Sequence, residues 1–203
     1  MPMTRVLMAA ATAAALAACG PSVAAPTVGQ PAPAFSATDS KGKTVSLSDF
    51  RGRTVVLEWF NPECPFVKKF YEPGAMQKLQ ADARRDGVVW LVVNSGAPGK
   101  QGHLTPEQAN AFIRANGVAA TAYIPDPSGT IGRAYDARTT PHMFVIDPAG
   151  TLVYAGGIDD IQSANSADIA KARNFVTLAL ADLKAGRPVA NPTSRPYGCS
   201  VKY

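Results

Sequence analysis

The chain has 203 residues, 46% of them hydrophobic, and a formal net charge of +5. That length fits one domain with extensions, and the apolar fraction is enough for a buried core. The basic residues form no dense run, so the charge predicts no nucleic-acid partner. The two separated histidines and the cysteines lack the spacing of metal ligands, so we expect no metal and no cofactor.

The first segment, 1–18, has the composition of a secretory signal: one arginine, then a run of alanine, leucine, valine and methionine. Its end, Leu16-Ala17-Ala18-Cys19, resembles a bacterial lipobox, in which the cysteine is acylated. The resemblance implies a lipid anchor at Cys19 in the cell envelope, facing the periplasm and, because Gly20 follows, at the outer membrane. Ordinary signal cleavage, leaving a soluble periplasmic protein, is the alternative. Residues 19–33 follow as a proline-rich tether.

Between Phe35 and Phe50, two short strand-like runs flank the turn sequence Asp39-Ser40-Lys41-Gly42, which predicts a β-hairpin. The apolar run 55–60 that follows predicts a core strand. Inside it, Glu58 is a lone carboxyl, which is costly to bury unless it is paired or protonated, and burial raises the pKa of such a group. An exposed Glu58 on one face of an edge strand is the alternative.

The strand breaks at Asn61-Pro62, and a helix is expected to begin directly after Cys64. Pro65 suits the first helical position, because its missing N–H costs nothing there. Unpaired N–H groups and a positive partial charge at a helix N-terminus favour a thiolate over a thiol. We therefore predict that Cys64 is a reactive cysteine with a lowered pKa. A buried structural cysteine is the alternative.

Helical and strand patterns alternate through the rest of the chain. The first helix is expected to extend towards Arg85 with an interruption at Pro73-Gly74, and Ser166 is expected to cap a last helix over 166–185. Between them, the patterns predict a capped helix from Thr105 and strands over 88–94, 122–125, the residues after Pro141, and 151–155. A proline-stiffened tail then carries Cys199, beside an aromatic residue and a glycine that offer an anchor and a flexible step.

An aromatic pair, Trp59-Phe60, followed by Cys64-Pro65 at the start of a helix resembles the active-site corner of the thioredoxin superfamily. The hairpin and the turn LSDFRG resemble its redoxin branch, which includes membrane-anchored thiol–disulfide oxidoreductases and the alkyl hydroperoxide reductase/thiol-specific antioxidant group. The resemblance, over residues 28–185, implies an α/β thioredoxin-like fold: a central mixed β-sheet flanked by helices on both faces, with an N-terminal β-hairpin extension. The domain is then expected over 34–186 and the tail over 187–203.

The same resemblance implies roles for individual residues. Glu58, six residues before Cys64, matches a buried acid that relays protons. The Thr140-Pro141 step matches a cis-proline signature that, together with Pro65, positions the partner, so we expect this peptide bond to be cis. The family's motif is usually Cys-x-x-Cys, and here Val67 stands in place of the second cysteine.

We predict a cell-envelope thiol–disulfide oxidoreductase that acts on protein or small-molecule thiols and disulfides. Cys64 is the expected nucleophile and Cys199 the expected resolving cysteine, since these two remain for a pair once Cys19 is lipidated. A thiol-dependent peroxidase acting on peroxides is the second hypothesis, although Leu57 and Asn61 stand where such enzymes carry Pro and Thr or Ser. The third is a non-catalytic binding module with a structural Cys64–Cys199 disulfide. A free tail thiol is the alternative to any pair.

Overall fold

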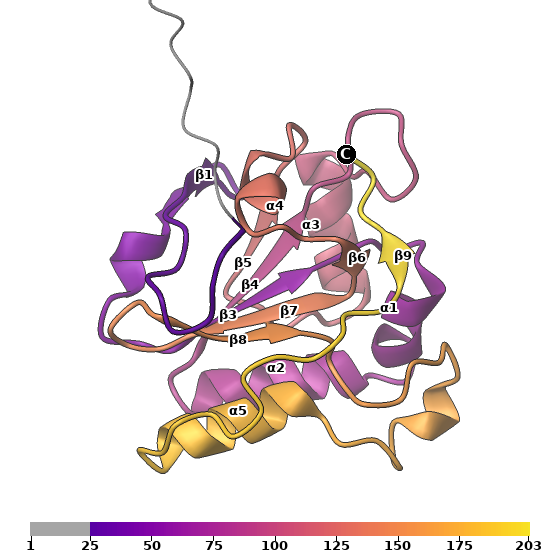
Figure 1. Cartoon of the computed structure of the whole chain (residues 1–203). Coiled ribbons are helices and arrows are strands. Elements are labelled where there is room, and N and C mark those ends of the chain that lie inside the picture. The colour runs from indigo at the N-terminus through magenta and orange to yellow at the C-terminus, as the bar shows by residue number, and fades with distance from the viewer. Residues whose placement is uncertain (1–24) are drawn as a thin grey trace, which may run out of the picture.

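The computed structural model describes residues 25–203, which fold around a five-stranded mixed sheet (Figure 1). The strand order is β5-β4-β3-β7-β8, with bounds β3 Val55–Trp59, β4 Val89–Asn94, β5 Ala122–Pro125, β7 His142–Ile146 and β8 Leu152–Gly156. Strand β3 is central, parallel to β4 and antiparallel to β7. Every residue of β3 is buried. Burial on both faces explains why its sequence is apolar without polar alternation, Glu58 excepted.

Successive side chains of β3 point to two separate cores, one on each face of the sheet. Val56 belongs to the core beneath the helices α1 (Pro65–Tyr71), α2 (Ala75–Arg85), α3 (Pro106–Ala115) and α5 (Phe175–Lys184). Leu57 belongs to the core beneath α4 (Thr130–Ala134), the hairpin strands β1 (Ser36–Thr38) and β2 (Thr44–Ser46), and the 3-10 helix η1 (Leu47–Phe50). In Figure 1, α2 and α5 lie on one side of the sheet, and α4 and the hairpin lie on the other. The predicted mixed sheet, with helices on both faces and an N-terminal hairpin, is confirmed.

Two predicted helix boundaries are also confirmed. Helix α1 ends before Pro73-Gly74 and α2 begins after it, with Gly74 at a φ of 78°, a conformation that favours glycine. Helix α3 begins after Thr105, whose hydroxyl oxygen accepts a hydrogen bond from the Gln108 N–H at 3.3 Å.

The last helix is shorter than predicted. The segment expected to form one helix over 166–185 contains a 3-10 helix, η2 (Ser166–Asp168), and then α5, which begins only at Phe175. The cap of α5 is not Ser166 but Asn174, whose side chain accepts from the Thr177 N–H. Asp160, in the preceding loop, accepts hydrogen bonds from the backbone and the guanidinium of Arg173. This contact holds the chain in a non-helical conformation just before Asn174.

Both ends of the described chain are attached to the sheet. Gly29 donates its N–H to the Leu152 carbonyl at 2.8 Å, and Ala32 donates to the Gly150 carbonyl at 3.0 Å. The predicted tether over 19–33 is therefore wrong for its last residues, because these backbone groups pair with the edge strand β8 and with the turn that precedes it. The predicted signal segment, Cys19 and the start of the tether lie outside the described residues.

The tail is a structured part of the domain. Its Cys199–Ser200 segment forms a further strand, β9, which pairs with β6 (Thr139–Thr140), so β8 is not the last strand. Within residues 25–203, no helix combines the length and the apolar character that crossing a membrane requires.

Candidate active site

Cys64 lies where β3 gives way to α1, as the sequence predicts. It is the N-cap residue of α1, and Pro65 is the first helical residue. The preceding turn is held by Asn61, whose side-chain oxygen accepts from the Glu63 N–H at 2.8 Å and whose carbonyl accepts from the Cys64 N–H at 3.2 Å. The turn places the Cys64 side chain in the core beneath the helices, where the residue is 0% exposed.

Thr140 is the first of two partners that meet Cys64. The Thr140–Pro141 peptide bond is cis, as predicted. The Sγ of Cys64, as a thiol, donates to the Thr140 carbonyl oxygen at 3.0 Å. The contact joins two stretches that the sequence singled out separately.

Cys199 is the second partner. Strand β9 pairs antiparallel with β6, so that Cys199 lies opposite Thr140, and β9 runs beside β6 near α1 in Figure 1. Gly198 has a φ of 136°, and a Cβ there would lie 2.1 Å from the Thr140 carbonyl oxygen. Only glycine allows so close an approach, so Gly198 brings the tail against β6 rather than acting as a flexible step. Both cysteines are free thiols, and each lies close enough to the other to shift the pKa of its thiol.

The contact sets the two thiols apart chemically. Burial raises the pKa of Cys64, but hydrogen bonds from the Cys199 thiol, from Thr140 and from the backbone of Cys199 and Val67 together outweigh burial, so the pKa of Cys64 is lowered. Burial, hydrogen bonding to Cys64 and its nearby charge raise the pKa of Cys199 to about 11. The Thr140 carbonyl alone favours a protonated Cys64, and several donors oppose it. Of the two thiols, Cys64 therefore gives up its proton more readily than Cys199.

A buried charged cluster fastens the tail next to Cys199. Lys69, on α1, forms an ion pair with Asp159 at 3.0 Å, and the two side chains are 0% and 1% exposed. The Lys69 Nζ also lies 3.3 Å from the hydroxyl of Tyr197, which donates to Asp159. The Tyr197 ring packs edge-on against Phe66. Tyr197 is thus the aromatic anchor expected from the sequence. The sequence does not predict the buried pair of Lys69 with Asp159, because nothing in it separates Lys69 from the adjacent Lys68.

Glu58 is buried, and its hydrogen bonds lead away from the thiols. Its carboxylate oxygens accept from the hydroxyl of Tyr71 at 2.8 Å, from Gln80 at 3.0 Å and from the indole of Trp90 at 2.8 Å. Burial raises the pKa of Glu58, although these donors oppose the rise. The alternative of an exposed edge-strand glutamate is wrong. The described hydrogen bonds of Glu58 reach neither Cys64 nor Cys199.

Neither histidine belongs to this site. His142, on β7, packs against Phe144 in the core on the opposite face from Cys64, and burial lowers its pKa to about 4. His103 lies in a loop, with Nδ1 2.8 Å from the Gly96 carbonyl oxygen. Among residues 25–203, no three His, Cys, Asp or Glu side chains gather as a metal site would require.

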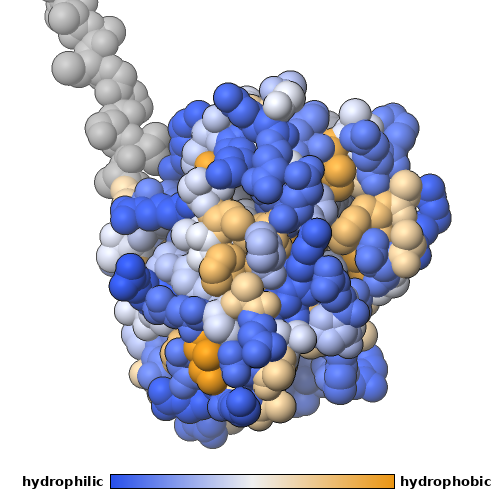
Figure 2. Space-filling view, turned by 90° about the vertical axis from the view of Figure 1, so that its right-hand side faces the viewer, coloured by the Kyte–Doolittle hydropathy of each residue, from blue (hydrophilic) through white to orange (hydrophobic). Residues whose placement is uncertain are grey.

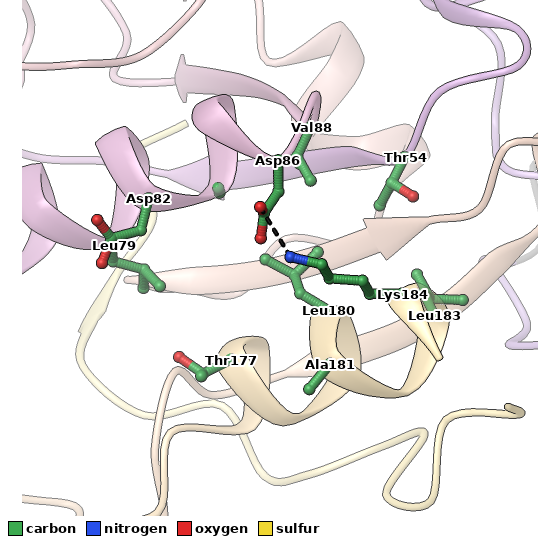
Figure 3. A pocket seen from close by; sticks show the side chains of 11 residues that line it. Thr54, Leu79, Asp82, Asp86, Val88, Thr177, Leu180, Ala181, Leu183 and Lys184 are labelled. Carbon is green, nitrogen blue, oxygen red and sulfur yellow. Dashed lines mark hydrogen bonds and ion pairs between the residues drawn. The ribbon is translucent and has the colours of Figure 1, made fainter. Parts of the chain in front are cut away.

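A cavity of about 340 Å³ lies away from the thiols, between α2 and α5 (Figure 3). Apolar side chains such as Leu79 and Leu180 line it, and Lys184 pairs with Asp86 across it at 2.8 Å. No residue that the sequence analysis named as a site residue lines this cavity. Cys64, Cys199 and the other predicted site residues therefore lie outside this cavity.

The model of the AhpC/TSA family matches residues 28–155, more than half of the chain. The chain belongs to the AhpC/TSA family. Among curated relatives, this AhpC/TSA protein is 32% identical over 125 residues to "Thiol-disulfide oxidoreductase ResA" of Geobacillus kaustophilus (strain HTA426). The match covers 62% of this chain and 66%, just under two thirds, of the relative's length. The relative's name agrees with the oxidoreductase class that the sequence predicts.

Solved structures resemble this AhpC/TSA protein over much of its length. An uncharacterized conserved protein from Geobacillus kaustophilus matches with a TM-score of 0.74 at 28% identity, covering 87% of this chain and 92% of that one. A Chlorobium tepidum structure assigned as a thiol:disulfide interchange protein DsbE matches with a TM-score of 0.52 at 26% identity, covering 64% and 85%. With the sheet topology, these matches confirm the thioredoxin-like fold and the redoxin branch.

Proposed function

We propose that this protein is a cell-envelope thiol–disulfide oxidoreductase whose redox pair is Cys64 and Cys199. One observation carries the proposal: Cys199 pairs with Thr140 across the β6–β9 ladder, and the Thr140 carbonyl oxygen accepts from the Cys64 thiol, so two thiols that are far apart in the sequence lie at one place. Two thiols in contact can give up two electrons by forming a disulfide. Cys199 thereby supplies the second sulfur that Val67 does not.

The two cysteines have different parts in the exchange. Cys64 is the nucleophilic thiolate, and Cys199 is the second sulfur, which carries the proton. Exchange proceeds through a mixed disulfide with a protein or small-molecule thiol or disulfide. Thr140 contacts both cysteines, so with Pro141 and Pro65 it holds the pair in place and positions the partner. A proton role for Glu58 would have to run through water.

Cys19 is the proposed attachment to the membrane. The lipobox-like Leu-Ala-Ala-Cys sequence supports acylation, and several acyl chains give stable anchoring. From Cys19 to Gly29, where the chain joins β8, about ten residues can span roughly 35 Å. Mass spectrometry of the mature N-terminus tests the proposal: diacylated Cys19 supports it, and an unmodified later residue indicates a soluble periplasmic protein.

A thiol-dependent peroxidase is the second candidate, because the AhpC/TSA family name includes the antioxidant group. The surroundings of Cys64 favour it less. Asn61 accepts from the Glu63 N–H and donates one amide N–H to the Gln101 carbonyl at 3.4 Å, so at most its second N–H is left for a peroxide, and the Thr or Ser hydroxyl of those enzymes is missing. Leu57 lies in the core on the other face of the sheet.

Three parallel measurements on the full chain separate these functions. Reduction of insulin with dithiothreitol as electron donor, faster than dithiothreitol alone, is the result expected for an oxidoreductase. Peroxide consumption with a thiol donor, without insulin reduction, would favour the peroxidase. A Cys64–Cys199 disulfide that forms but supports neither reaction would favour the binding module.

A further inference from the structure

The two sulfurs of the proposed pair differ in access. Cys64 is 0% exposed, whereas Cys199 is partly exposed. Figure 2 shows the side of the molecule on which α1 and β9 lie, where apolar patches are interspersed with hydrophilic residues. A partner that approaches this side meets the tail before it meets Cys64. Direct exchange at Cys64 would therefore require the tail to leave.

The tail is fastened on both sides of Cys199, which makes its departure costly. Before Cys199, Tyr197 is bound to the buried Lys69–Asp159 pair. After it, Val201 donates its N–H to the Arg138 carbonyl at 3.0 Å, and the Tyr203 hydroxyl donates to the Ala137 carbonyl at 2.7 Å. Lifting the tail would break these bonds and the β6–β9 ladder together, so the closed arrangement is the one that a partner encounters.

The chemistry of disulfide exchange points the same way. An incoming thiolate prefers the sulfur whose neighbour is the better leaving group, and the thiol with the lower pKa leaves faster. In an oxidised pair, attack on Cys199 expels Cys64, whose pKa is lowered, whereas attack on Cys64 expels Cys199, whose pKa is raised to about 11. Access and leaving-group order therefore select the same sulfur.

We propose, building on the redox pair above, that partner sulfurs bond only to Cys199 and that Cys64 is an inner sulfur that never bonds to a partner. A partner dithiol supplies the electrons. Its first thiolate attacks the Cys199 Sγ, a bond forms between these two sulfurs, the Cys64–Cys199 bond breaks, and its electron pair leaves on Cys64 as a thiolate. The second thiolate of the partner then attacks the partner's own sulfur and releases Cys199, which takes up a proton.

The partner thereby becomes a disulfide, and the Cys64–Cys199 pair has gained two electrons. With a partner disulfide the same steps run backwards: Cys199 passes its proton to the Cys64 thiolate as it attacks the partner, and the first partner thiolate leaves. Cys64 then gives that proton to the partner thiolate that has left, attacks Cys199 in the mixed disulfide, and releases the second partner sulfur as a thiolate. This order gives the Cys64 thiolate its nucleophilic role without exposing it to the partner.

The test maps the adduct on the oxidised full chain carrying Cys19→Ala. The protein is treated with glutathione, the reaction is stopped with acid within its first turnover, and the modified cysteine is identified by tandem mass spectrometry. We expect glutathione on Cys199 in at least tenfold excess over Cys64. Equal amounts, or more on Cys64, would overturn the proposal. A protein that forms no Cys64–Cys199 disulfide on oxidation would overturn both the proposed pair and this inference.

A second variant tests whether the tail enforces the choice. Gly198→Ala places a Cβ against the Thr140 carbonyl and should push the tail away from β6. The share of glutathione on Cys64 should then rise at least fivefold. Gly117→Ala is the matched control, because it imposes a positive φ on alanine where no atom lies within 4 Å of the added Cβ. An unchanged ratio in Gly198→Ala, or an equal change in the control, would show that the tail does not shield Cys64.

Discussion

Removal of the Lys69 charge should destabilise the domain far more than removal of a surface lysine. The Lys69 ammonium lies 3.0 Å from Asp159, 3.0 Å from the Ile161 carbonyl and 3.3 Å from the Tyr197 hydroxyl. Lys69→Met keeps much of the packing but leaves Asp159 buried without its counter-charge. Breaking a buried pair from one side costs about 3–5 kcal/mol. For a domain of this size, that is a fall in Tm of about 10 °C.

Urea unfolding of the reduced protein, with Cys19→Ala in every variant, measures this cost. Lys184→Met is the control, since the Lys184–Asp86 pair is 69% and 51% exposed and is worth less than about 1 kcal/mol. The double variant Lys69→Met/Asp159→Asn should recover part of the loss, because it removes the uncompensated charge while keeping an acceptor for Tyr197. The reasoning is refuted if Lys69→Met costs no more than the control, or if the double variant is less stable than Lys69→Met.

The other predictions concern the thiols, the buried acid and the anchor. The alkylation rate of Cys64 should titrate with a pKa below that of an ordinary cysteine, about 8.5. Cys199→Ala should raise this pKa, because it removes a hydrogen-bond donor to Cys64. A wild-type pKa at or above the ordinary value would contradict the inference that Cys64 is activated. The oxidised protein should be about 4–5 kcal/mol more stable than the reduced one in urea, because the disulfide closes a loop of more than about one hundred residues; equal stabilities would mean that no unstrained Cys64–Cys199 bond forms. Because the pKa of Glu58 is raised by folding, its contribution to stability is present below its unfolded value of about 4.5 and is lost as pH rises through the folded value. Glu58→Gln should flatten that part of the stability–pH curve, and an unchanged exchange rate across about pH 6–9 in this variant would remove Glu58 from proton transfer. Cys19→Ala should release the protein from the membrane fraction without changing its Tm, and retention in that fraction would rule out a lipid anchor at Cys19.

Local sequence signals predicted the helix boundaries that depend on local interactions. Pro65 marks the start of α1 because its missing N–H costs nothing there, and Gly74 marks the break before α2 because its φ is positive. The sequence predicts the start of the last helix too early, because the helical spacing of apolar residues continues from α5 back to Ile169. The contact of Arg173 with Asp160 ends the helix pattern there, and that contact is tertiary.

In the active site, too, some features follow from local sequence signals and others only from tertiary contacts. The sequence by itself determined that Cys64 lies at a strand-to-helix corner, because Pro65 strongly favours the first helical position. The resemblance to the thioredoxin superfamily implied that Thr140-Pro141 belongs to the same site, and the cis peptide bond agrees with it. Only the tertiary structure decided that Cys199 rests against Cys64, and that Lys69 is buried under the tail rather than solvated. The reason is physical: a thiol's pKa and a lysine's burial depend on atoms that folding brings together from distant parts of the chain, and no local pattern records those neighbours.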